Sequence, residues 1–311
     1  MHHTFYPPEP ALPETLAITP RYHAFGFSSL NQPMGHFTIG SGSGKSILLM
    51  SGLHGDEYEG VILLNYVLRE ILRHTQPIEQ VNKTDLLNLL SEWTIFFLPI
   101  ANPDAFILNQ RWNVNLVDLN RNFPASDWQP VPLNPRYPPG KAPASEKETQ
   151  NIIELISNIK PLMVIDFHSY KESVLLPTFV PNMKDIITVE RYIQEWSEQI
   201  GIPVGDEVMG YATPGAKQTW CVEQGYPEVT LEIKRGLGSN EIRTKYLHPT
   251  IKFIFNFINL YSKQDSEQDS EQDSKQDSKQ DSEQDSERPQ YLSANRIHDQ
   301  AKTSTTPTYL P

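Results

Sequence analysis

The segment Ser46-Ile-Leu-Leu-Met-Ser-Gly-Leu-His-Gly-Asp-Glu57 joins a short apolar run to a polar turn. The run from Ser46 to Met50 is typical of a strand that is buried on both faces of a sheet. The next stretch, residues 60–72, has helical apolar periodicity. His54 and Glu57 therefore lie at a strand-to-helix junction, three residues apart, where an imidazole and a carboxylate can converge on one ion.

The sequence on either side of this segment alternates between the same two patterns. Apolar runs predict further strands at residues 94–98, 162–166 and 229–233, and helical patterns lie at residues 145–159 and 189–199. The first of these helices is expected to open with a capping box from Ser145 to Glu148. Strands separated by helices predict a single α/β domain with a mixed, mostly parallel sheet flanked by helices. In such sheets ligands bind outside the carboxyl ends of the strands.

Composition narrows the function classes. The chain has 311 residues, 38% of them hydrophobic, so it can bury a core of one large domain. Its formal net charge of -12 argues against a nucleic-acid partner. No apolar run approaches the roughly 20 residues of a membrane helix, and the first residues lack the basic and apolar regions of a secretory signal. We therefore expect a cytoplasmic protein without a membrane partner.

The acidity is concentrated near the C-terminus. Residues 264–287 repeat the unit Gln-Asp-Ser-Glu/Lys six times and carry a charge of -8, which leaves -4 for all other residues. This segment has no apolar side chain and cannot form a core. We predict an N-terminal extension (residues 1–34), a catalytic domain (35–262) and a disordered low-complexity tail (263–311).

A third metal-binding side chain completes the pattern begun by His54 and Glu57. The single cysteine, Cys221, excludes a cysteine-built zinc site, so the ligands must be His and carboxylates. His168 lies at the end of another predicted strand, within Asp166-Phe-His-Ser-Tyr170. Two His and one Glu, with a fourth position open, are a known ligand set of catalytic zinc. The sequence therefore predicts a site for one zinc ion.

The loop from Arg111 to Pro124 is rich in arginine and asparagine. A guanidinium group binds a carboxylate through two hydrogen bonds and stays charged. This composition, close to a metal, favours recognition of a carboxylate on a substrate.

Together these motifs resemble the zinc carboxypeptidase family in order and context. They are His54-Gly-Asp-Glu57, Asp118-Leu-Asn-Arg-Asn-Phe-Pro124, the His168 strand end and Thr230-Leu-Glu232. The murein peptide amidases are the most similar branch, on Asn102-Pro-Asp104, Asp118 to Trp128, Glu146 to Gln150, Gly210 to Gly215, and Trp220-Cys221. The resemblance covers roughly residues 35–260.

The resemblance implies roles for five residues in catalysis. His54, Glu57 and His168 would bind zinc. Arg111 would polarise the scissile carbonyl and stabilise its developing negative charge, as a preorganised cation can. Glu232 would be the general base that takes a proton from the attacking water and returns it to the leaving amine.

The resemblance also implies substrate-binding residues. Asn120 and Arg121 would hold the free carboxylate of a small peptide substrate, and Tyr211 resembles a mobile tyrosine that covers it. Lys217 falls in the region of the family's specificity pocket, where the murein amidases have an apolar residue. We hypothesise that Lys217 pairs with an acidic side chain of the leaving residue; the alternative is a lysine directed to solvent.

The expected reaction is zinc-dependent hydrolysis of an amide bond next to a terminal residue that bears a carboxylate. The favoured substrate is a murein tripeptide cut between γ-D-glutamate and the diamino acid, in peptidoglycan recycling. Three alternatives remain: a general carboxypeptidase acting on α-linked peptides, a deacylase of the aspartoacylase type, and a non-catalytic peptide-binding protein. Ala105 and Leu116 stand where relatives often carry glycine, so the turn before Asp118 is expected to differ. The sequence leaves the oligomeric state open.

Overall fold

A mixed β-sheet forms the centre of the protein. The computed structural model describes residues 20–40, 44–73, 83–171, 173–181, 183–205 and 212–262. Within these residues the sheet has seven strands, in the spatial order β1-β2-β4-β3-β5-β7-β6. Their bounds are β1 Arg21–Phe27, β2 Pro33–Gly40, β3 Lys45–Ser51, β4 Trp93–Leu98, β5 Val164–Tyr170, β6 Val174–Thr178 and β7 Glu228–Lys234.

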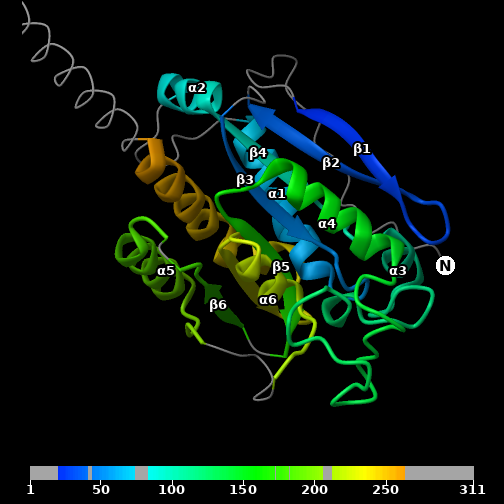
Figure 1. Ribbon diagram of the computed structural model, residues 1–311. Helices are drawn as coiled ribbons and strands as arrows, with labels where there is room; N and C mark the ends of the chain where they lie inside the picture. Colours follow the sequence, from blue (N-terminus) through cyan, green and yellow to red (C-terminus); the bar gives the residue numbers. More distant parts are fainter. Residues whose placement is uncertain are drawn as a thin grey trace, which may run out of the picture. The chain divides into compact units, whose positions relative to one another are not determined.

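The four central strands are parallel and the outer ones are antiparallel. β3 pairs in parallel with β4 and β5, and β5 pairs in parallel with β7. β1, β2 and β6 join as antiparallel strands at the two edges (Figure 1). The predicted α/β class and mixed sheet are confirmed, and the parallel centre places the carboxyl ends of four strands at one edge.

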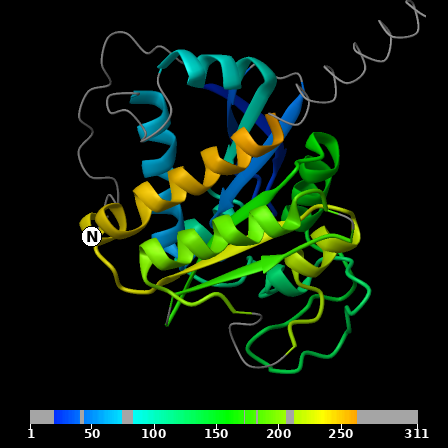
Figure 2. The same ribbon diagram turned by 90° about the vertical axis from the view of Figure 1, so that its left-hand side faces the viewer.

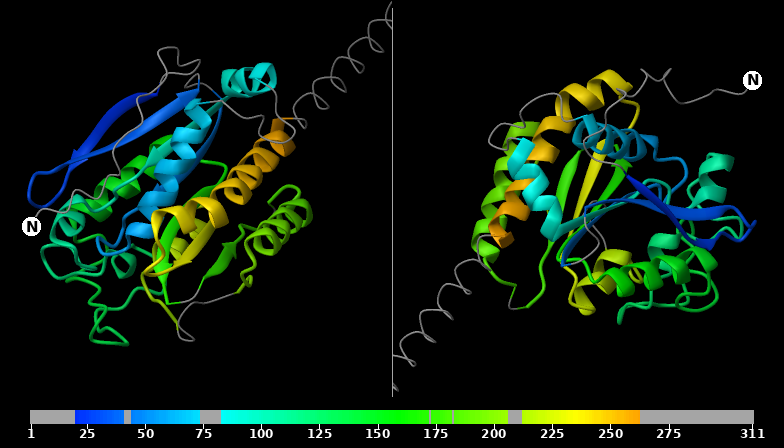
Figure 3. Two further views of the ribbon diagram at one scale, coloured as in Figure 1. Left: turned by 180° about the vertical axis from the view of Figure 1, so that it is seen from behind. Right: turned by 90° about the horizontal axis from the view of Figure 1, so that it is seen from above.

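Helices cover both faces of the sheet. α1, α5 and the helical residues 248–260 lie over one face, and α4 and α6 lie over the other (Figure 3). α5 and residues 248–260 run side by side (Figure 2), where the rings of Trp196 and Phe253 stack with centroids 4.5 Å apart. The helices are α1 Tyr58–Arg73, α2 Lys83–Glu92, α3 Pro103–Leu108, α4 Lys147–Ile159, α5 Ile186–Ile200, α6 Lys217–Glu223 and α7 Ser239–Ile242. A 3-10 turn spans Leu119–Arg121, and a π-helical turn spans Arg243–Leu247.

Alternation along β3 divides the core between the two faces. Leu48 and Met50 are fully buried in a cluster with Ile152 of α4 and Trp220 of α6. Ile47 and Leu49 are equally buried and point to the opposite face. A strand that is apolar on both faces is thus explained by helices on both sides, as the continuous apolar run from Ser46 to Met50 predicted.

Two boundaries differ from the expectation. The sheet extends into the segment expected as an N-terminal extension, because β1 pairs with β2 and residue 35 lies inside β2. Helix α4 begins at Lys147, its N-cap is Glu146, and no side chain caps its first turn. The predicted capping box is therefore wrong: the Ser145 hydroxyl donates to the carboxylate of Glu146 instead.

The expected low-complexity tail, residues 263–311, lies outside the described residues. Among the helices that are described, none combines the length and apolarity that crossing a membrane requires.

Candidate metal centre and active site

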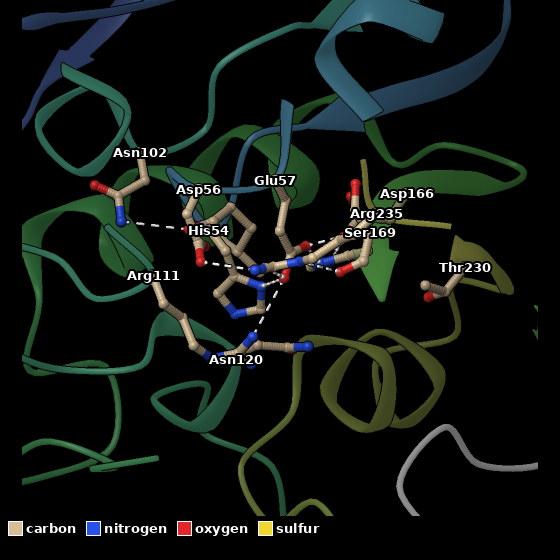
Figure 4. Close-up of polar contacts among 12 residues, drawn as sticks. His54, Asp56, Glu57, Asn102, Arg111, Asn120, Asp166, Ser169, Thr230 and Arg235 are labelled. Carbon is tan, nitrogen blue, oxygen red and sulfur yellow. Dashed lines mark hydrogen bonds and ion pairs between the residues drawn. The ribbon is translucent and has the colours of Figure 1, made fainter. Parts of the chain in front are cut away.

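The predicted metal ligands meet at the carboxyl ends of the parallel strands. Figure 4 shows two of them, His54 and Glu57, side by side with Arg111 close to them. His54 and Glu57 lie in the turn between β3 and α1, and His168 lies on β5. Glu232 of β7 is the direct neighbour of His168 in the parallel ladder, so both side chains project from the same face. The side chains of these four residues, which come from β5, β7 and the end of β3, therefore surround one space.

Gly55 allows the turn between His54 and Glu57 to lie against α3. A Cβ atom at residue 55 would come within 2.0 Å of the backbone carbon of Ala105, which no side chain tolerates. The glycine in the His54-Gly-Asp-Glu57 motif is thus required by close backbone approach.

His54, Glu57 and His168 form a group that could hold one metal ion. One potential ligand atom from each lies within 4.8 Å of the others, and all three residues are buried. Both imidazoles direct Nδ1 at the Glu57 carboxylate, at 2.9 Å for His54 and 2.8 Å for His168. Two imidazole nitrogens and one carboxylate facing one point fit zinc, which binds such donors with an open position for substrate or water.

A carboxylate behind each imidazole fixes the orientation of the ring. The Nε2 atom of His54 lies 3.0 Å from Asp118, and that of His168 lies 3.0 Å from Asp166. Such outer partners hold a metal-binding imidazole in one tautomer with its other nitrogen directed at the metal. Sequence analysis assigned no role to either aspartate. The signal for Asp166 was available, because residues two apart on a strand share a face.

Arg111 lies within the same network. Its Nε donates to Asp118 at 2.9 Å and its Nη1 to Glu57 at 3.2 Å. Burial would lower the pKa of Arg111, but Asp118 and Glu57 outweigh it and raise that pKa above its ordinary value. The arginine is therefore a fixed positive charge beside the candidate metal site, as an oxyanion-stabilising group must be.

Arg235 is a further cation at Glu57 that sequence analysis missed as a site residue. Its guanidinium lies 3.2 Å from the Glu57 carboxylate and 3.0 Å from Asp56. No local pattern in the sequence indicated these partners.

Glu232 has the environment of a general base. The residue as a whole is partly exposed, but its carboxylate is buried. Burial, together with the negative charge of Glu57, raises the pKa of Glu232 to about 7. This effect outweighs the positive charges of His168, His54 and Arg111, which lower the pKa. Among the described residues no group donates a hydrogen bond to this carboxylate. A base whose pKa lies near the working pH can both accept and return a proton.

Asn120 and Arg121 lie on the 3-10 turn Leu119–Arg121, beside a surface hollow. The Asn120 side-chain oxygen accepts from the backbone N–H of Lys217 at 2.9 Å, so its amide nitrogen is turned the other way. The ring of Tyr137 lies 4.9 Å from the Arg111 guanidinium carbon and 5.2 Å from that of Arg121. The hollow is shallow and is lined by Arg121, Gln129, Pro132, Leu133, Asn134, Tyr137, Pro139, Ala212 and Pro214. Sequence analysis assigned no role to Tyr137 either.

The turn before Asp118 keeps a glycine-like conformation without a glycine. Leu116 has a φ of 60°, in the left-handed region, and its side chain is exposed. Its backbone N–H donates to Asn113 at 3.0 Å, which closes the turn. Ala105, the other departure from relatives, is buried in α3. The departure at Leu116 therefore introduces backbone strain while the turn itself is closed by a hydrogen bond.

Lys217 does not occupy the position that was hypothesised for it. Its side chain is 1% exposed, and its ammonium group lies 3.1 Å from Asp166 and 2.6 Å from Glu228. Pairing with an acidic substrate side chain is therefore wrong, and so is the solvent-directed alternative, because the chain's own carboxylates surround the charge. Tyr211, predicted to cover the substrate, lies outside the described residues.

Comparison with known proteins agrees with this geometry. The family profile described as zinc carboxypeptidase matches residues 17–236. The chain belongs to the zinc carboxypeptidase family. As a zinc carboxypeptidase homologue it is a zinc metallopeptidase, and the cluster of His54, Glu57 and His168 suits the one ion that the family uses.

Relatives within the zinc carboxypeptidase family include amidases. Murein peptide amidase A of Escherichia coli (strain K12) is 30% identical over 243 residues, which cover 74% of this chain and 88% of that protein. The crystal structure of murein-tripeptide amidase MpaA from Escherichia coli O157 matches with a TM-score of 0.54 at 28% identity, over 78% of this chain and 92% of that one. Thrombin activatable fibrinolysis inhibitor, at 18% identity and a TM-score of 0.64 over 77% of this chain and 69% of that one, shows the same fold.

Proposed function

We propose that this zinc metallopeptidase is an amidase that cleaves the bond between γ-D-glutamate and diaminopimelate in murein peptides. The observation that carries the proposal is the convergence of His54, Glu57 and His168 with the carboxylate of Glu232 and the guanidinium of Arg111. The relative named murein peptide amidase A, which aligns over most of its length, supports the choice of substrate.

A cytoplasmic location, as expected from the sequence, is part of the proposal and is tested by cell fractionation.

Each catalytic step has a residue in position. When bound by His54, Glu57 and His168, zinc would supply Lewis-acid polarisation of the scissile carbonyl and lower the pKa of the attacking water. Glu232 takes the proton from that water and delivers it to the leaving amine. Arg111, held by Asp118 and Glu57, stabilises the negative charge that develops on the carbonyl oxygen.

Asn120 and Arg121 are the residues that recognise the substrate in this proposal. Asn120 presents its amide nitrogen because its oxygen is already engaged, and Arg121 lines the neighbouring hollow. These groups suit the free carboxylate of the leaving residue, which a guanidinium can bind through two hydrogen bonds.

The test is mass-spectrometric analysis of products from two substrate classes. The zinc-loaded protein is incubated with a γ-linked murein tripeptide and, separately, with α-linked peptides, and the Glu232→Gln variant serves as the blank. Release of free diaminopimelate from the tripeptide only, absent with the variant, is the expected result. Cleavage of α-linked peptides alone would overturn the proposed substrate and leave the zinc-dependent mechanism intact.

A general carboxypeptidase is the second candidate, because every residue assigned to catalysis here serves an α-linked peptide equally well. Carboxypeptidase A2 of Rattus norvegicus is 29% identical over 172 residues, which span 49% of this chain and 40% of that protein. The shorter alignment makes this the weaker candidate, and the same experiment separates the two.

A further inference from the structure

A buried ion cluster lies directly beneath the candidate metal site. Its members are Lys217 at the start of α6, Asp166 on β5 and Glu228 at the start of β7. The Lys217 ammonium nitrogen lies 3.1 Å from Asp166 Oδ2 and 2.6 Å from Glu228 Oε2. Each of the three residues is at most 1% exposed, so water does not screen these charges.

Such a cluster is not explained by stability alone. Removing three charges from water is costly, and well-packed apolar side chains of similar volume are often at least as stabilising as buried ion pairs. The neighbouring contacts therefore have to indicate what the charges do.

Asp166 connects the cluster to a candidate metal ligand. Its Oδ2 atom, the one that faces Lys217, also lies 3.0 Å from Nε2 of His168. The other nitrogen of His168 lies 2.8 Å from Glu57. Lys217, Asp166, His168 and Glu57 thus form one continuous polar chain that ends at the candidate metal site.

Lys217 also contacts the substrate side of the site through its backbone. Its N–H donates to the side-chain oxygen of Asn120 at 2.9 Å. An N–H group can only face the oxygen of that amide, so the contact fixes which way the amide of Asn120 points. One residue at the start of α6 therefore touches both the carboxylate behind His168 and the amide beside Arg121.

We propose that Lys217 is a positioning residue that holds Asp166 as the acceptor for His168, so that Nδ1 of His168 is presented to the metal. The inference rests on the proposed metal site and adds to it a residue that contacts neither metal nor substrate. Glu228 has a different role, because it balances the charge of Lys217 and accepts a hydrogen bond from Thr230 at 3.2 Å. Among the described residues, no contact between Glu228 and His168 is found.

The experiment measures zinc affinity by competition with a chelator of known affinity, at one fixed pH, on folded protein. Lys217→Met keeps the length of the side chain and removes its charge. We expect it to weaken zinc binding about 10- to 100-fold, the usual effect of losing an outer partner of a metal ligand. The matched control is Glu228→Gln, an equally buried change on the other side of Lys217, which should alter the zinc affinity less than about threefold.

A double-mutant cycle separates positioning from general damage. If Lys217 acts through Asp166, then Lys217→Met combined with Asp166→Asn should bind zinc no more weakly than Asp166→Asn alone. If Lys217→Met does not fold, the pair Lys217→Met and Glu228→Gln, which keeps the net charge of the cluster, replaces it and should show the same loss of affinity.

The possible failures are distinguishable. A wild-type protein that binds no zinc would overturn the proposed metal site itself. A wild-type protein that binds zinc, with unchanged affinity in folded Lys217→Met or additive losses in the double variant, would overturn only the role of Lys217. The same holds if Lys217→Met changes the selectivity for acidic leaving residues while its zinc affinity stays constant.

Discussion

Glu57 is the residue on which the polar contacts of the site converge. Its carboxylate faces His54, His168, Arg111 and Arg235 and accepts from the backbone N–H of Ser169. Burial alone would raise the pKa of Glu57, but the charges and hydrogen bonds of the two histidines lower it well below its ordinary value. Glu57 is therefore ionised throughout the physiological range, which is the state that binds a metal.

At the residue scale, Glu232→Gln tests the general base. The amide keeps the size of the side chain but cannot accept the proton of the attacking water, so we expect kcat to fall about 10²- to 10⁴-fold. Zinc content, measured by atomic absorption, should stay at the wild-type level because Glu232 is not a ligand. A variant with wild-type kcat would show that another group is the base.

The pH dependence of hydrolysis also depends on Glu232. Its pKa is raised to about 7 without metal, mainly by burial. The base works only when ionised, so kcat/KM should rise with pH through this pKa and fall as the carboxylate becomes protonated. A bound cation favours the ionised form, and the acid limb of the zinc enzyme should therefore lie below pH 7.

The measurement is kcat/KM across the range from about pH 5 to about pH 9. An activity that declines with rising pH throughout this range would contradict the assignment of Glu232 as base.

At the scale of elements, the turn that precedes Asp118 carries strain at Leu116. A non-glycine residue in the left-handed region costs about 1–2 kcal/mol, and this exposed leucine contributes little burial in return. Glycine at this position would relieve the strain but would lose more conformational entropy on folding, which offsets part of the gain. Leu116→Gly should therefore stabilise the fold by about 0.5–1 kcal/mol, or raise Tm by about 1–4 °C.

Differential scanning calorimetry checks this prediction, with Leu133→Gly as the control. Leu133 is about equally exposed but lacks a positive φ, so glycine there should lower Tm. Equal effects of the two substitutions would show that Leu116 is not strained.

At the scale of the whole molecule, zinc should couple to the stability of the fold. The ligands come from the β3–α1 turn and from β5, so a bound ion links segments more than a hundred residues apart in sequence. Free zinc at 1,000 times its Kd would stabilise the folded state by about 4 kcal/mol, which for a domain of this size raises Tm by about 8–16 °C.

Thermal unfolding with zinc and with excess chelator measures this difference, and His168→Ala provides the control because it removes a ligand. A zinc-dependent shift that persists in His168→Ala would place the ion elsewhere.

The sequence by itself determined the α/β class and indicated the candidate metal ligands. Both are encoded locally: apolar runs such as Ser46 to Met50 have the period of buried strands, and the polar residues that follow them must lie at the carboxyl edge of a parallel sheet. The edge strand β1 was not predicted from the sequence, and the start of α4 was predicted with the wrong cap. β1 is exposed along most of its length, and α4 starts without a side-chain cap.

Only the tertiary structure decided which residues support those ligands. Asp118 and Arg235 contact side chains that are distant in sequence, and Asp166 has a second contact with Lys217 of α6 that is equally distant; no local pattern fixes such contacts. Lys217 shows the difference most clearly. Its sequence context suggested a specificity pocket, but packing of α6 against β7 buries its charge between two carboxylates of the chain itself. A buried charge requires a partner, and the identity of that partner is a property of the fold.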